Sequence, residues 1–138
     1  MVEKDILLAK VAIIQRCLQR IKDSTQLDPA SLDDFDKQDI FVLNLQRAIQ
    51  AAVDIAAHTI TSEDWGLPDT LKKHFAILAE KKVLNHELSE KLQKMIGFRN
   101  IAVHDYQSIN VDVLKTILQK DLQDLETCYH KIIDYYNL

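Results

Sequence analysis

Apolar residues recur at intervals of three and four along most of the chain, a spacing that places them on one side of an α-helix. The first segment with this pattern spans residues 2–22. We expect Asp23-Ser24, and after it Asp28-Pro29, to end that helix, because these residue types favour turns. No segment alternates apolar and polar residues for long enough to predict a strand. The apolar stripe of the first helix consists of Leu7, Val11, Ile14, Cys17, Leu18 and Ile21.

A second periodic segment spans residues 34–59 and is rich in alanine. Small side chains on its apolar side would let a neighbouring helix approach closely. Asp33 or Asp34 stands at its beginning, where a carboxylate caps the free N–H groups and complements the helix dipole. The apolar side of this helix consists of Phe41, Leu45, Ala48, Ala52, Ile55 and Ala56.

Three further helices are predicted in the second half of the chain, after a connection over residues 61–67. Pro68 suits the first turn of the third helix. Asn85 is expected to cap the fourth helix, which continues to Val103, and Asn110 the fifth. Their stripes consist of Leu71, Phe75 and Leu78, of Leu88, Leu92, Met95 and Ile96, and of Leu114, Ile117, Leu118, Leu122, Leu125, Tyr129, Ile132 and Tyr136. The pattern predicts an all-α fold, an up-and-down helical bundle of about five helices in one domain spanning residues 1–138.

The composition agrees with a globular helical protein. The chain is 47% hydrophobic and 28% charged, which excludes a disordered chain, and it has only two Gly and two Pro. Charges interrupt the apolar pattern at the N-terminus, so we expect no signal peptide, no membrane-spanning segment and a cytoplasmic location. Cys17 and Cys128 both lie on apolar stripes and are expected to be reduced core thiols.

The charge is divided unevenly along the chain. The net charge of −4 argues against binding nucleic acid, but residues 71–104 carry a local charge of +4, which leaves −8 for the rest. A basic stretch of this kind is either a phosphate-attracting face or an ordinary solvated helix surface. Its basic residues are Lys72, Lys73, Lys81, Lys82, Lys91, Lys94 and Arg99.

The residues with the most chemistry lie between Arg99 and Tyr106. Arginine offers a planar, always-charged group that binds phosphate, and histidine exchanges a proton near neutral pH. A base that deprotonates the ribose 2′-OH, a cation that stabilises the transition state and an acid that protonates the leaving oxygen suffice to cleave RNA without a metal. Arg99 and His104 could supply these groups, and Asn100 could orient the phosphate.

One helix does not bring Arg99 and His104 together, because five residues turn an α-helix by about 500°, which leaves them about 140° apart. Asn100 and His104, spaced by four, share a face. A two-fold dimer that pairs this segment with its copy would collect two arginines and two histidines in one cleft. It would also provide separate histidines for the acid and the base.

The segment Arg99-Asn100-Ile101-Ala102-Val103-His104-Asp105-Tyr106 resembles the motif of the HepT-like ribonuclease toxins of the HEPN superfamily. Residues 44–55 resemble the family's other recurrent stretch, and the resemblance extends along essentially the whole chain. It implies a helical homodimer encoded beside a minimal nucleotidyltransferase antitoxin. It also implies that Arg99 and His104 form the ribonuclease site, that Asn100 helps to shape it, and that the antitoxin modifies Tyr106 with AMP. Added bulk and negative charge there would repel RNA phosphate.

Two alternatives and two pairs of residues remain open. The chain could instead be a non-catalytic nucleotide-binding or adaptor module that acts through its nucleotidyltransferase partner, or a dimeric scaffold. Arg47 and Asp54 share a face of the second helix and either flank the cleft or form an interhelical salt bridge. Asp54 and His58 could pair or form half a metal site, but no third ligand is evident, so neither a metal nor a cofactor is expected.

Overall fold

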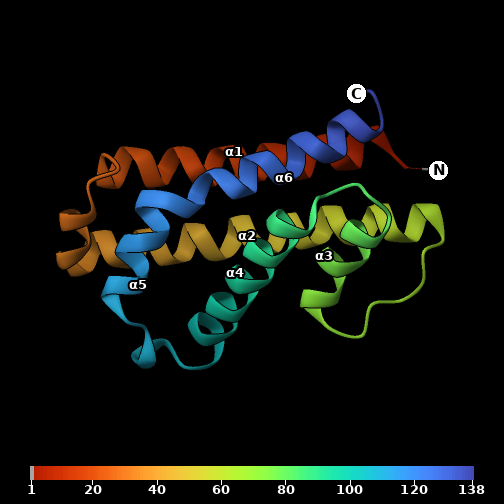
Figure 1. The fold of residues 1–138 in the computed structure, drawn as a ribbon. Coiled ribbons are helices and arrows are strands. Elements are labelled where there is room, and N and C mark those ends of the chain that lie inside the picture. The colour runs from red at the N-terminus through yellow and green to blue at the C-terminus, as the bar shows by residue number, and fades with distance from the viewer. Residues whose placement is uncertain (1) are drawn as a thin grey trace.

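The computed structural model describes residues 2–138, and the regular structure in that range is helical throughout. Helices α1 (Lys4–Thr25) and α2 (Phe35–Glu63) pack side by side, and α6 (Leu122–Tyr135) lies along them (Figure 1). Helices α3 (Leu71–Glu80) and α4 (His86–His104) form a second pair that also packs on α2. The predicted all-α bundle is confirmed.

Helix α1 buries the six residues of its predicted stripe. Its predicted end is wrong, however, because Asp23 and Ser24 lie inside the helix. The helix continues to Thr25, whose hydroxyl donates to the carbonyl of Ile21 in the core. It ends at Gln26, where the backbone turns left-handed, and the 3-10 turn η1 (Pro29–Asp33) leads into α2.

Helix α2 begins where the sequence predicts. The carboxylate of Asp34 accepts hydrogen bonds from the backbone N–H groups of Asp36 and Lys37, so Asp34 rather than Asp33 is the cap. The helix extends four residues beyond the predicted end at residue 59 and stops at Asp64, which adopts left-handed backbone angles. The first part of the predicted connection over residues 61–67 is therefore helical.

The predicted position of Pro68 in the first turn of α3 is wrong. The helix begins at Leu71, and Pro68 lies in the connection before it. Thr70 determines the start, because its side-chain oxygen accepts a hydrogen bond from the N–H of Lys73 at 3.1 Å and so satisfies a free helix donor.

The caps of the last helices are as predicted, but the final helix is not regular. Asn85 caps α4 and Asn110 caps α5 (Val111–Thr116). A π-helical turn, η3 (Ile117–Asp121), then joins α5 to α6 without a break, so the three form the single predicted fifth helix. A π-turn has more residues per turn than an α-helix, which keeps residues spaced by four on one face. The residues so aligned, all buried, are Leu114, Leu118 and Leu122.

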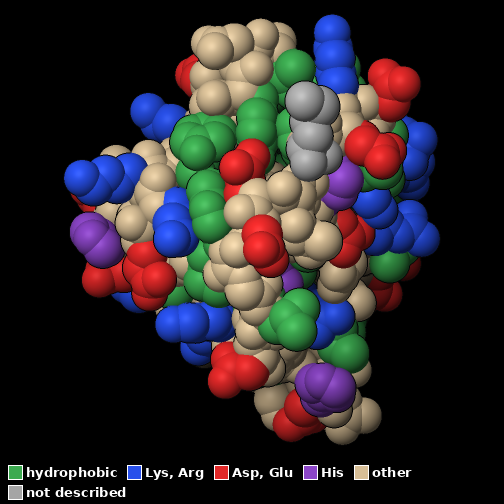
Figure 2. All heavy atoms as spheres, turned by 90° about the vertical axis from the view of Figure 1, so that its right-hand side faces the viewer, with side chains coloured by type: hydrophobic (Ala, Val, Ile, Leu, Met, Phe, Trp, Pro, Cys, Tyr) green, Lys and Arg blue, Asp and Glu red, His purple; other side chains and the backbone are tan. Residues whose placement is uncertain are grey.

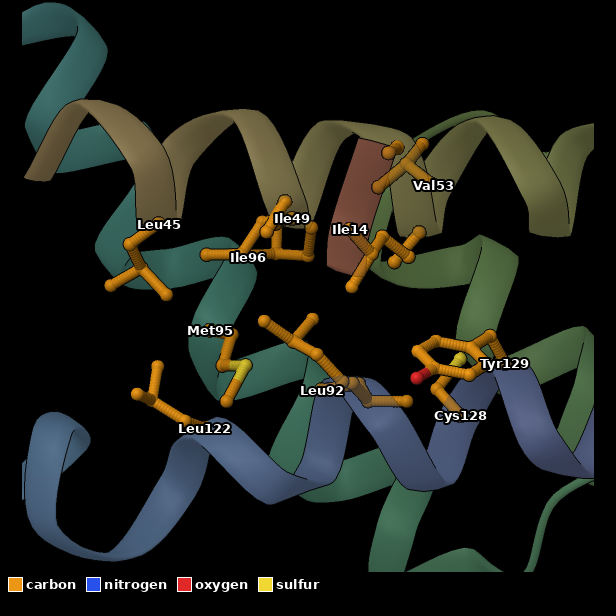
Figure 3. Packing of buried hydrophobic residues seen from close by; sticks show 14 of the residues in the cluster. Ile14, Leu45, Ile49, Val53, Leu92, Met95, Ile96, Leu122, Cys128 and Tyr129 are labelled. Carbon is orange, nitrogen blue, oxygen red and sulfur yellow. The ribbon is translucent and has the colours of Figure 1, made fainter. Parts of the chain in front are cut away.

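The core lies between α1, α2, α4 and α6. Figure 3 shows Ile14 from α1, Ile49 from α2, Leu92 from α4 and Tyr129 from α6 converging in it. Cys128 lies in the same core, and both cysteines are free and buried, as predicted. Burial raises the pKa of the Cys128 thiol to about 12, so it remains protonated at neutral pH.

The expectation that no segment could span a membrane is wrong, because α2 is long enough and apolar enough to cross one. In the fold, however, 61% of its apolar window is buried. Its apolar side is the one that packs against α1 and α3, as in the core helix of a soluble protein. Its hydrophobicity is therefore accounted for by the core.

Candidate active site

The segment from Arg99 to Tyr106 occupies the last two turns of α4 and the turn after it. The helix ends at His104, where a basic side chain is favoured by the helix dipole. Asp105 leaves helical geometry, and the short 3-10 turn η2 (Tyr106–Ser108) follows. This bend directs Tyr106 back towards the beginning of α2.

Arg99 is half-buried and held at two points. Its Nη2 donates to Oε1 of Gln50 on α2 at 3.2 Å, and its Nη1 donates to Oδ1 of Asn100 at 3.3 Å. Its Nε is buried and has no hydrogen-bond partner among residues 2–138. The guanidinium group therefore lies at the surface of α2 with part of its hydrogen-bonding capacity unused.

His104 is exposed, as is Asn100. Within residues 2–138, no hydrogen bond joins the imidazole to Arg99 or to any other group. The structure thus joins Arg99 to Asn100 by a hydrogen bond and shows none from Arg99 to His104, which agrees with the angular separation of about 140° on one helix.

Tyr106 is 43% exposed, and its hydroxyl donates a hydrogen bond to the carboxylate of Asp39 on α2. Partial burial, followed by this hydrogen bond and the negative charge of Asp39, raises the pKa of Tyr106 to about 12. A surface hollow of about 710 Å³ borders the pair and is also lined by Phe35 and Gln107. Tyr106 is therefore a neutral, accessible phenol beside open space.

Asp54 forms an interhelical salt bridge with Lys10 of α1 at 3.0 Å. Its other oxygen accepts a hydrogen bond from Gln50 at 3.0 Å, so Asp54 is linked to Arg99 through Gln50. Arg47 is exposed. Burial raises the pKa of the Cys17 thiol of α1, and the charges of Arg16 and Arg47 partly oppose it, so Arg47 lies near α1.

Asp54 and His58 have different hydrogen-bond partners. Nε2 of His58 accepts a hydrogen bond from the N–H of Glu3 at 3.0 Å, whereas Asp54 is bound to Lys10 and Gln50. Across residues 2–138 there is no group of three His, Cys, Asp or Glu side chains that could hold a metal ion.

Three residues that contact the predicted site residues were not predicted from the sequence: Gln50, Lys10 and Asp39. The spacing of Gln50 and Asp54, four residues apart on one helix, was a signal that they could bond to each other. The contact of Gln50 with Arg99, however, joins residues 49 positions apart and depends on how α4 packs on α2. Asp39 likewise stands 67 positions before Tyr106.

The basic stretch over residues 71–104 is partly neutralised. Lys73 pairs with Glu80 at 3.7 Å and Lys91 with Glu87 at 3.4 Å, in exposed pairs of small energetic value. On the face shown in Figure 2, which includes the end of the molecule where both termini lie, basic and acidic side chains are interspersed. That face has no surface of a single sign.

Comparison with known proteins gives these residues a context. The family described as ribonuclease HepT-like matches residues 14–132. The chain is also 40% identical over 122 residues to the mRNA nuclease HepT of Shewanella oneidensis, covering 88% of this chain and 92% of that protein. The chain belongs to the HepT-like ribonuclease family. A tRNA nuclease HepT of Aphanizomenon flos-aquae is 28% identical over 138 residues, covering 97% of this chain and 92% of that protein.

Solved structures of HepT-like proteins have the same fold. A toxin–antitoxin crystal structure with AMP-PNP contains a chain that is 38% identical, with a TM-score of 0.90 over 95% of this chain and 99% of that one. The tri-AMPylated HEPN toxin of Shewanella oneidensis, in complex with its MNT antitoxin, is also 38% identical, with a TM-score of 0.90 over 96% and 99% of the two chains. The expected resemblance to HEPN toxins is confirmed.

Proposed function

We propose that this HepT-like protein is the toxin of a toxin–antitoxin pair and cleaves RNA as a metal-independent endoribonuclease in the cytoplasm. The proposal includes its neutralisation by a nucleotidyltransferase antitoxin. The observation that carries it is the placement of the Arg99–Tyr106 segment at the end of α4, with an anchored guanidinium and an exposed imidazole. The nuclease and antitoxin-bound relatives support it.

In the proposed reaction, the ribose 2′-oxygen attacks the adjacent phosphorus while a histidine removes its proton. The bond from phosphorus to the 5′-oxygen breaks, and a second histidine protonates that leaving oxygen, which gives a 2′,3′-cyclic phosphate and a 5′-hydroxyl end. Arg99 binds the non-bridging oxygens, where negative charge accumulates in the transition state. Asn100, hydrogen-bonded to Arg99, orients the same phosphate.

We propose a homodimer in which two copies of the motif share one cleft. One chain supplies one His104, and no hydrogen bond joins it to Arg99 among residues 2–138. The proposed reaction uses an acid and a base on opposite sides of the phosphorus. Within the motif, Ile101 and Val103 are 46% and 41% exposed, and a second copy of the chain would cover these apolar side chains. A two-fold axis near His104 would provide both histidines.

We further propose that the antitoxin transfers AMP from ATP to the hydroxyl of Tyr106, which forms a bond from the phenolic oxygen to the α-phosphorus and releases pyrophosphate and the phenolic proton. The phenol is accessible, and Tyr106 follows the proposed catalytic His104 by two residues in the chain. Each added nucleotide brings a phosphodiester charge and the bulk of adenosine, which oppose the approach of RNA phosphate. The tri-AMPylated state of the Shewanella oneidensis toxin is the precedent among relatives.

The test is cleavage of total RNA and of tRNA in EDTA by purified protein that mass spectrometry shows to be free of AMP. Arg99→Ala and His104→Ala should abolish cleavage while remaining folded. Arg16→Ala and His86→Ala change the same residue types at exposed positions and should leave it intact. Absence of cleavage by folded, unmodified, dimeric wild-type protein would overturn the proposal in favour of a non-catalytic adaptor.

A further inference from the structure

A series of three polar contacts connects Arg99 on α4 to Lys10 on α1. Nη2 of Arg99 donates to Oε1 of Gln50 at 3.2 Å, and Nε2 of Gln50 donates to Oδ1 of Asp54 at 3.0 Å. Nζ of Lys10 then donates to Oδ2 of Asp54 at 3.0 Å. These contacts thus lead from α4 through α2 to α1, and of the three residues beyond Arg99 only Gln50 is hydrogen-bonded to it.

The partners of Gln50 determine which way its amide points. A guanidinium group only donates hydrogen bonds and an ionised carboxylate only accepts them, whereas an amide does both at opposite ends. Asp54 therefore takes the NH₂ end of Gln50, and the oxygen end must face Arg99. Lys10 holds Asp54 in turn, so the oxygen that receives Arg99 is fixed by α1 and α2 together.

The identity of Gln50 also preserves the charge of Arg99. A carboxylate at this position would form a charge-assisted pair with the guanidinium and compete with a substrate phosphate. The neutral amide of Gln50 holds the guanidinium without neutralising it. The carboxylate of Asp54 binds the other end of that amide and is paired with Lys10. The positive charge that the cleft needs is thereby left available.

Arg99 retains donors for a ligand while it is held. Arginine has five N–H groups, of which Gln50 and Asn100 use one each. Nε is buried without a partner among residues 2–138, an unfavourable state that a phosphate oxygen reaching it would relieve.

We propose that Gln50 is a positioning residue that holds the guanidinium of Arg99 in its phosphate-binding orientation, with Asp54 and Lys10 fixing the amide of Gln50. The inference rests on the proposed function in so far as Arg99 contacts the scissile phosphate. It assigns Asp54 a role behind the cleft, through Gln50, in place of a direct one at its edge.

The first experiment needs no RNA. Side-chain ¹⁵N NMR of the Nε and Nη groups of Arg99 is compared between wild type, Gln50→Met and Gln50→Glu, with assignment by Arg99→Lys. Methionine matches glutamine in length but accepts no comparable hydrogen bond, so Gln50→Met should speed rotation of the guanidinium. Gln50→Glu should keep it ordered. Unchanged guanidinium dynamics in Gln50→Met, in a protein that melts as wild type does, would overturn the proposal.

The second experiment measures kcat and KM for cleavage of an RNA oligonucleotide. Gln50→Met should lower kcat by between about tenfold and a hundredfold, because loss of orientation at the reacting group has effects of this size. Gln50→Glu should lower kcat/KM although Arg99 stays ordered, since it adds a competing charge. Asp54→Asn should have a smaller effect in the same direction, because its amide can present either end to Gln50.

The control is Gln46→Met, which makes the same change one turn earlier on α2 and should leave kcat and KM unchanged. Binding to a 2′-deoxy oligonucleotide, which cannot be cleaved, is then measured in the Arg99→Ala background. Gln50→Met should cause no further loss of affinity there. A loss equal to the one that Gln50→Met causes when Arg99 is present would overturn the proposal. Failure of wild type to cleave RNA would reject the proposed function, and the NMR comparison would still decide whether Gln50 orders Arg99. Wild-type kcat in Gln50→Met would overturn this inference alone.

Discussion

The hydroxyl of Tyr106 donates a hydrogen bond to the carboxylate of Asp39, although the two residues stand 67 positions apart in the chain. Tyr106 belongs to the turn after α4, and Asp39 lies in the second turn of α2. The bond therefore ties the turn that follows the proposed catalytic segment to the beginning of the central helix. It also places a carboxylate against the oxygen that we propose as the acceptor of AMP.

Modification of Tyr106 should break this bond. An AMP adduct removes the proton that Tyr106 donates and places a phosphodiester charge next to Asp39, and the two negative charges repel each other. We expect faster amide hydrogen exchange in residues 106–108 of the modified protein. Asp39→Ala, which removes the acceptor, should cause similar exchange without modification. Unchanged protection in the modified protein would contradict this prediction.

The titration of Tyr106 should depend on Asp39. With the pKa of Tyr106 raised to about 12 from an ordinary value of 10.0, the folded protein holds this proton at pH values where the unfolded chain releases it. The contribution of this group to stability is therefore lost as pH rises from about 10 to about 12. Ultraviolet titration at the phenolate band should show a lower pKa in Asp39→Asn, with Tyr106→Phe identifying the signal. Burial is the first cause of the shift, so only part of it should disappear.

Asp124 should make the protein more stable as the solution becomes more acidic. Burial raises the pKa of its carboxyl, with Lys91 opposing the shift and Asp121 and Glu87 adding to it. The folded state then binds this proton more tightly than the unfolded chain, so stability falls as pH rises through the folded pKa. Asp124→Asn should increase the free energy of unfolding at pH 7, and the gain should shrink towards pH 4.

Urea denaturation at several pH values measures this gain for Asp124→Asn. Asp69→Asn is the matched control, because Asp69 is exposed in the connection before α3 and the same change there should have little effect at any pH. A gain for Asp124→Asn that stays constant between pH 7 and pH 4 would show that the shift is not the cause.

Loss of the cap of α4 should weaken the helix that carries the proposed site. The side-chain oxygen of Asn85 accepts a hydrogen bond from the N–H of Leu88 at 2.7 Å. Asn85→Ala should lower the free energy of unfolding by about 1 kcal/mol, whereas Asn85→Asp keeps an acceptor and should retain most of the stability. Thermal or urea denaturation of the three proteins tests this order.

Repeated local patterns made much of the fold predictable. The apolar stripe of α1 could be predicted because one side of a helix must bury its apolar residues. The caps Asn85 and Asn110 could be predicted because a cap binds N–H groups within three residues of itself. The errors arose where two local signals competed. Thr70 supplied a side-chain acceptor that Pro68 lacks. The left-handed residues that end α1 and α2 are Gln26 and Asp64, and neither is a glycine.

The candidate site divides in the same way. Arg99, Asn100, His104 and Tyr106 could be predicted because they are contiguous and chemically distinctive. The contacts that hold them could not, because Gln50 and Asp39 meet this segment only through the packing of α4 and its following turn against α2. The π-turn at η3 was hidden for a related reason, since four-residue spacing of leucines suits a regular helix as well.

Asp39 and Gln50 are eleven residues apart on α2, close to three helical turns, so they lie on nearly the same side of that helix about 16 Å apart. The end of α4 and the turn after it are thus bound to α2 at two points. Asp39 binds Tyr106, the proposed modification site, and Gln50 binds Arg99. A lineage under selection to evade its antitoxin would have little freedom to remodel this side of α2. A shift of α2 that displaced Tyr106 would also displace Gln50, which holds Arg99. Escape from modification by the antitoxin would therefore reduce the proposed RNA cleavage.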